Sequence, residues 1–188
     1  MNTIFIFLHV AAAIVLLGPV VVATSMFPAE ADKSRVGGEE ATGRASVLHR
    51  ITKTYGMLSA LVPLLGGVVM AFDWDLYSSN YWLHTAIILS VIAWAILFFM
   101  VIPQQRKMMG SLGALDPADA DPADRTGNFE KSKAKAAAGA GIFNLMWFLT
   151  LILMFLPSPD AGASSDSTTS ATTASETVAT TAATTATQ

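Results

Sequence analysis

The sequence predicts an all-α membrane protein with four transmembrane helices, both termini outside and a disordered C-terminal tail. Hydrophobic residues make up 53% and charged residues 13% of the 188 residues, whereas a soluble domain carries about 25% charged residues. Four stretches without Asp, Glu, Lys or Arg are long enough to cross a bilayer, which takes about 20 helical residues. All 11 Lys and Arg residues lie in two of the connecting loops.

The four uncharged stretches are expected to be helices, because backbone polar groups in lipid must be hydrogen-bonded within the segment. The first stretch lacks the basic start of a signal peptide and its apolar run is too long for one, so we expect it to be retained. Together they form one transmembrane domain, residues 1–157. The expected spans are residues 3–27, 54–72, 81–102 and 137–156.

Proline residues mark the ends and bends of the predicted helices. Pro28, Pro103 and Pro157 lie where three of the spans are expected to stop. Pro19 and Pro63 lie inside the first and second spans. Membrane helices tolerate such prolines, so both are interpreted as packing kinks.

The two loops that carry the cations predict how the chain crosses the membrane. One loop runs from Glu30 to Lys53 and the other from Pro103 to Lys135, whereas the turn from Asp73 to Asn80 has no Lys or Arg. Four successive spans place both basic loops on one side, and short basic loops stay in the cytoplasm. The sequence therefore predicts a multi-pass plasma-membrane protein with its N and C termini outside.

The C-terminal tail, residues 158–188, consists almost entirely of Thr, Ser and Ala. This composition buries too little apolar surface to offset the loss of chain entropy, so we expect an external, disordered segment. Two interpretations stay open for it. One is a plain solvated tail, and the other is a Thr-rich acceptor of O-glycosylation.

Composition and charge argue against several classes of function. The chain has no cysteine, which excludes disulfides, thiolate metal sites and cysteine nucleophiles. A net charge of −3 disfavours nucleic acid as a partner. The spans contain no acidic residue, lysine or arginine, and these are the residues that mark ion and proton routes. We therefore expect a non-catalytic protein without a transport path.

Small residues on the fourth span form the first candidate contact site. Gly139 and Gly141 allow close approach of a neighbouring helix, and the Asn144 amide can donate a hydrogen bond across such an interface. These residues can pack within the four helices or against another subunit.

Aromatic residues around the outer turn form the second candidate contact site. Trp74, Tyr77 and Trp82 are typical of the belt that anchors helices at a membrane surface. Next to the acidic outer turn, they can also contact the external part of a partner protein. Membrane lipid is the expected surrounding, and a bound lipid is an expected ligand.

Two histidines form an alternative site. His9 on the first span and His84 on the third are expected about 10 Å and roughly 6 Å below the outer membrane edge, at 1.5 Å per residue. Two neutral imidazoles that face each other can ligate a b-type haem or a metal. The other interpretation is a hydrogen bond from each ring to a carbonyl or a headgroup. His49, in the first basic loop, is expected to be solvated at headgroup level.

The first span resembles known membrane proteins. Leu8-His9-Val10-Ala11-Ala12, followed by Leu16-Leu17-Gly18-Pro19, resembles the start of a family of small integral membrane proteins of unknown function. With its alanine-rich composition, four spans and Thr-rich tail, the chain resembles the actinobacterial association factor of the cytochrome bcc–cytochrome c oxidase respiratory supercomplex. The resemblance implies a non-catalytic accessory subunit that acts in the assembly or stability of that complex and contacts its cytochrome bcc and oxidase subunits.

A second resemblance involves the early histidine. Leu8-His9 is also similar to the first helix of the membrane-type protoporphyrinogen oxidase and copper-resistance families, and this implies a role of His9 on haem or copper. Two hypotheses follow. The first is an accessory subunit without a cofactor, and the second is a b-haem-binding membrane protein with His9 and His84 as ligands.

Overall fold

The computed structural model describes residues 2–72, 74–78, 80–115, 117, 121–122, 124 and 128–156. The chain divides into a helical unit, Met1–Met154, and a second unit, Phe155–Gln188. In the second unit only residues 155 and 156 are described. The tail that the sequence predicts to be disordered, residues 158–188, therefore lies outside the described residues.

Four helical rods among the described residues are long and apolar enough to cross a membrane, as predicted: Thr3–Lys33, Gly38–Phe72, Tyr81–Ser111 and Phe129–Phe155. The first rod comprises α1 (Asn2–Ala12), η1 (Ala13–Leu17) and α2 (Gly18–Lys33). The second comprises α3 (Gly38–Leu58) and α4 (Leu61–Phe72), and the short α5 (Trp74–Tyr77) follows it. The third comprises α6 (Tyr81–Ile96), η2 (Leu97–Val101) and α7 (Ile102–Ser111), and the fourth is α8 (Phe129–Phe155).

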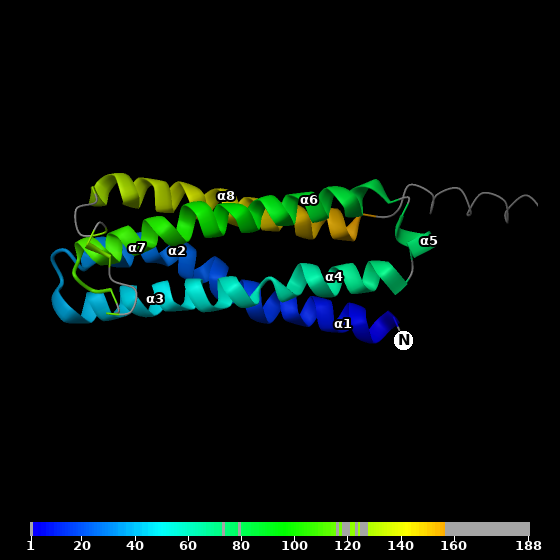
Figure 1. Ribbon diagram of the computed structural model, residues 1–188, viewed down its shortest axis with the longest axis horizontal. Helices are drawn as coiled ribbons and strands as arrows, with labels where there is room; N and C mark the ends of the chain where they lie inside the picture. Colours follow the sequence, from blue (N-terminus) through cyan, green and yellow to red (C-terminus); the bar gives the residue numbers. More distant parts are fainter. Residues whose placement is uncertain are drawn as a thin grey trace, which may run out of the picture. The chain divides into compact units, whose positions relative to one another are not determined.

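Successive rods run in opposite directions, as Figure 1 shows. The end of α2, the start of α3, the end of α7 and the start of α8 therefore meet at one end of the helical unit (Figure 1). We call it the charged end, because the described Lys and Arg residues all fall in residues 30–53 and 103–135. The predicted placement of both basic loops on one side agrees with this arrangement.

The prediction that Pro28 and Pro103 end their helices is wrong. α2 continues through Pro28 to Lys33, and α7 carries Pro103 in its first turn and continues to Ser111. A proline removes one backbone hydrogen bond, and packing of the surrounding helices compensates for this loss. Pro157 lies outside the described residues. The buried cluster that holds the two extensions consists of Phe27, Ala31, Ala45, Met108, Met109 and Ala136.

Both π-helical segments precede a proline. η1 ends at Leu17, two residues before Pro19, and η2 ends at Val101, two residues before Pro103. Proline has no N–H and its ring crowds the carbonyl four residues earlier, so the preceding turn widens into a π-helical turn. Pro19 therefore marks a widened turn inside a continuous rod.

Pro63 has a different effect, because α3 and α4 are separated by a turn at Ser59 and Ala60. The Ala60 N–H donates to the carbonyl three residues earlier (3.2 Å) and so releases the carbonyl of Gly56. The Ser59 hydroxyl (2.6 Å) and the Trp94 indole N–H from α6 (3.3 Å) donate to this carbonyl instead. Side chains thus satisfy the group that the break releases, as lipid surroundings require.

A second buried cluster holds the middle of the rods together. Like the cluster at the charged end, it contains side chains from all four rods, so each cluster joins the four rods. The cluster consists of Leu17, Val20, Val62, Ala93, Leu97, Val101 and Phe143.

Candidate functional site

The two histidines proposed as haem ligands have separate partners. His9 reaches from α1 to α4, where its Nδ1 lies 3.0 Å from the carbonyl oxygen of Val62. A Cβ added to Gly66 would lie 3.0 Å from Cε1 of His9, so the ring packs on this glycine. His84 lies in the first turn of α6, with its Nδ1 2.9 Å from the carbonyl oxygen of Asn80. The contacts found among the described residues do not join the two rings.

The hydrogen bonds of the histidines define what each ring can do chemically. When Nδ1 donates its proton to a carbonyl, the lone pair of the neutral imidazole is on Nε2. This is also the arrangement in which a histidine ligates a metal through Nε2. Among the described residues, no group of three or more His, Asp and Glu side chains is placed to hold a metal ion.

The small residues of α8 divide between two faces. Gly139 is buried, and a Cβ added there would lie 3.0 Å from Cγ2 of Val101. An added Cβ at Gly141 would have no atom within 4 Å, and Ala137 and Ala138 beside it are exposed as well. Gly139 therefore packs inside the chain, whereas Gly141 lies on an open face.

Asn144 forms its hydrogen bond inside the chain. Its Nδ2 donates to the Ser25 hydroxyl on α2 at 2.8 Å, and this hydroxyl donates to the carbonyl of Val21 at 2.7 Å. The Oδ1 atom of Asn144 is buried without a hydrogen-bond partner among the described residues. The cross-helix amide contact that the sequence suggests is thus directed at α2.

The aromatic residues lie at the end of the unit opposite the charged end (Figure 1). Trp74 in α5 is 59% exposed and Trp82 in α6 is 41% exposed. The Asn80 side chain caps α6, because its oxygen accepts hydrogen bonds from the backbone N–H groups of Trp82 (3.1 Å) and Leu83 (3.4 Å). Tyr77 belongs to α5, and its side chain is outside what the structure describes.

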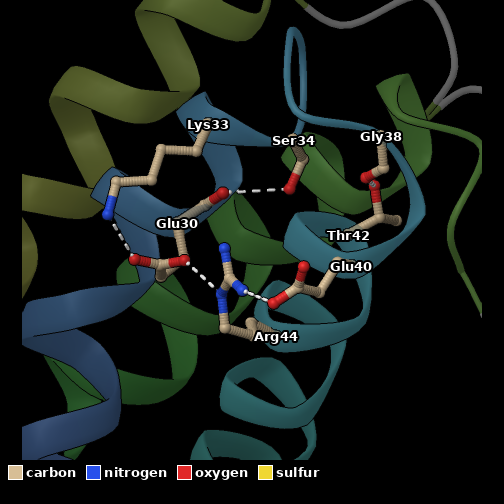
Figure 2. A network of polar contacts seen from close by, with 7 residues as sticks. All are labelled: Glu30, Lys33, Ser34, Gly38, Glu40, Thr42 and Arg44. Carbon is tan, nitrogen blue, oxygen red and sulfur yellow. Dashed lines mark hydrogen bonds and ion pairs between the residues drawn. The ribbon is translucent and has the colours of Figure 1, made fainter.

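The charged end carries an ion-pair network that sequence reasoning missed, and Figure 2 shows its centre. The Glu30 side chain is only 12% exposed, and its carboxylate accepts from Lys33 Nζ at 2.7 Å and from Arg44 Nε at 2.9 Å. Arg44 also pairs with Glu40 at 2.6 Å. The network joins the end of α2 to the start of α3. Its signal in the sequence was the acidic residues scattered among the cations of the first basic loop.

A second set of ion pairs joins α2 to α8. Lys133 Nζ lies 2.7 Å from the Asp32 carboxylate. Arg35 pairs with Glu130, and its guanidinium lies 4.9 Å from the centre of the Phe129 ring. Each exposed pair adds little stability by itself. Together the pairs link the ends of three rods.

A buried polar contact lies beside this network, between α3 and α7. Gln105 is fully buried, and its Nε2 donates to the Thr52 hydroxyl at 3.4 Å. The Oε1 of Gln105 lies 3.2 Å from Nδ1 of His49. The His49 ring is half-buried and lies 6.1 Å from the Phe27 ring, centre to centre. The expectation that His49 is simply solvated is therefore wrong.

Comparisons of this chain with protein-family models, with curated proteins and with solved structures found no match.

Proposed function

We propose that this protein is a non-catalytic accessory subunit of a larger membrane complex, and that it docks through one face of α8. We call this surface the α8 face. All its residues are exposed, and with one exception their side chains are no larger than a methyl group. The α8 face consists of Ala134, Ala137, Ala138, Gly141 and Leu145.

The single observation that supports the proposal most is that Gly139 packs inside the chain whereas Gly141, two residues later, faces outward. At 3.6 residues per turn, Gly139 and Gly141 point to opposite sides of α8. Gly139 lets α8 approach η2 inside the chain, since its missing Cβ leaves room for Val101. Gly141 leaves the same kind of room on the outside, where nothing lies within 4 Å. Membrane helices associate through such small residues, because they bring backbones close together.

The chemistry of the rods agrees with a structural role. The interior of the four rods is packed with apolar side chains, and the described charged residues gather toward the rod ends. A structural subunit needs only a stable scaffold and a docking face. The resemblance of the first helix supports the cytochrome bcc–cytochrome c oxidase supercomplex as the partner. The proposed setting is the plasma membrane, with the charged end in the cytoplasm and both termini outside.

The test compares two substitutions at open glycines. Gly141→Ile fills the α8 face, and Gly67→Ile on α4 is the matched control, because an added Cβ there also has no atom within 4 Å. The tagged chain is solubilised from its own membranes in a mild detergent and run on a native gel, and the band is identified by mass spectrometry. We expect the wild type and Gly67→Ile in a large band with cytochrome and oxidase subunits, and Gly141→Ile in a small band.

Two outcomes would count against the proposal. A wild-type band that holds only this chain removes the accessory role. A Gly141→Ile chain that stays in the large band removes the α8 face as the docking site.

The histidines favour one alternative, a membrane protein that binds b-type haem through His9 and His84. The supporting observation is that both Nδ1 atoms lie against backbone carbonyls, which leaves Nε2 of each ring for ligation. This alternative expects a Soret band in the purified protein that disappears in His9→Ala. A colourless, folded preparation from haem-replete cells would rule it out.

A further inference from the structure

A groove of about 900 Å³ opens at the charged end, between α3 and the end of α7 with the residues that follow it. Its size falls within the range of about 300–1,000 Å³ that is usual for ligand sites. One part of the wall is polar and includes His49, Arg50 and Lys53. The other part is apolar and includes Met57, Leu58 and Met109.

The polar and apolar parts follow one another along a single face of α3. Arg50, Lys53 and Met57 are spaced three and four residues apart, so they lie on the same side of the helix. The step from Arg50 to Met57 is about 10 Å at 1.5 Å per residue. α3 leads from the charged end into α4, which has no charged residue. The two cations are therefore at the level where a membrane surface would be.

The apolar part of the groove lies deeper along the same helix. Met57 is 66% exposed and Leu58 is 52% exposed, at the point where the rod enters its uncharged section. Met109 of α7 closes the groove from the other side and is buried. An occupant that complements this surface carries an anion at one end and a hydrocarbon chain at the other.

We propose that this groove binds one anionic phospholipid, with its phosphate at Arg50 and Lys53 and the start of an acyl chain along Met57 and Leu58. Arg and Lys at a membrane surface attract anionic headgroups, and their long aliphatic stems pack on apolar neighbours while the charge stays at the surface. Free phosphate would match only the polar part of the wall. A neutral phospholipid would match only the apolar part.

The experiment uses the full chain purified in a mild detergent and native mass spectrometry with defined lipids. The protein is offered phosphatidylglycerol and phosphatidylcholine with the same acyl chains at equal concentration. We expect one phosphatidylglycerol to be retained in preference to phosphatidylcholine. The double variant Arg50→Gln with Lys53→Gln should bind phosphatidylglycerol with an affinity lower on the order of tenfold, because each cation contributes separately to the binding free energy of an anionic lipid.

The matched control is Lys131→Gln with Lys135→Gln, which removes the same charge from exposed positions of α8 outside the groove. This control should bind phosphatidylglycerol as the wild type does. Met57→Gln tests the apolar part of the wall. It should weaken the binding of phosphatidylglycerol without changing the binding of glycerol phosphate. Thermal unfolding of each variant shows whether it is folded. If the double variant does not fold, Met57→Gln still tests the groove, because it replaces an exposed side chain.

Three results would overturn the proposal. The first is equal retention of the two lipids. The second is unchanged phosphatidylglycerol affinity in the groove variants. The third is inorganic phosphate that binds as tightly as phosphatidylglycerol and displaces it, which would assign the groove to free phosphate. The groove shares no residue with the α8 face, so these results are independent of the test of the accessory role.

Discussion

The imidazole of His9 occupies the space that a side chain at Gly66 would need. A Cβ at Gly66 would lie 3.0 Å from Cε1 of this ring. The Nδ1 atom of the same ring lies 3.0 Å from the carbonyl oxygen of Val62. Phe5 and Phe72 stack further along the same interface, with ring centres 5.0 Å apart. A side chain at residue 66 would therefore press on the His9 ring, which would have to shift to make room for it.

Gly66→Ala should destabilise the protein by about 1–3 kcal/mol, the usual range for overpacking a fitted interface. The control is its neighbour Gly67→Ala, which meets no atom within 4 Å and should leave stability unchanged or slightly raised, since alanine favours helix. Unfolding in detergent micelles, followed by circular dichroism, measures both. Equal stability of the two variants would contradict the proposed fit of the His9 ring.

Trp94→Phe should cost about 1 kcal/mol, a typical upper value for one hydrogen bond between membrane helices. The indole N–H of Trp94 donates to the Gly56 carbonyl that the break before Pro63 releases. Trp147→Phe is the control, because its Nε1 is buried without a partner among the described residues. The same unfolding assay should show a smaller loss of stability for Trp147→Phe than for Trp94→Phe. A larger loss for Trp147→Phe would contradict the conclusion that the Trp94 indole stabilises the break by its hydrogen bond to Gly56.

Gly139→Val should destabilise the isolated chain by about 1–3 kcal/mol, because the new side chain would collide with Val101 of η2. Gly141→Val should have little effect on the same chain in detergent, because its side of α8 is open. Thermal unfolding of the purified chain distinguishes the two. A destabilised Gly141→Val would mean that the α8 face packs within the chain.

The absence of cysteine makes the proposed orientation directly testable. Val36→Cys places a thiol in the turn at the charged end, where Val36 is 94% exposed, and Ser78→Cys places one in the exposed turn after α5. In intact cells, a membrane-impermeant maleimide should label Ser78→Cys and spare Val36→Cys until the cells are opened. Labelling in the opposite pattern would reverse the predicted topology.

Several residues show where sequence reasoning stopped. α6 buries a face of small residues at helical spacing, Ala86, Ser90 and Ala93, which the sequence analysis did not single out. A search for small residues three and four apart would have identified this face. The local chemistry of Pro28 predicts a helix end. α2 continues past Pro28, and the buried cluster that packs around this extension involves residues from distant parts of the chain.

Hydropathy and charge along the chain are enough to predict four membrane-length helices and two basic loops on the same side. Both follow from composition along the chain, since hydropathy and charge set what can lie in lipid. The packing of the helices was needed to show that Gly139 faces inward, that Gly141 faces outward and that His9 contacts α4. The physical reason is that lipid and a membrane-protein interior are equally apolar. Hydropathy therefore cannot tell a buried face from an exposed one, and close contacts between particular side chains make that distinction.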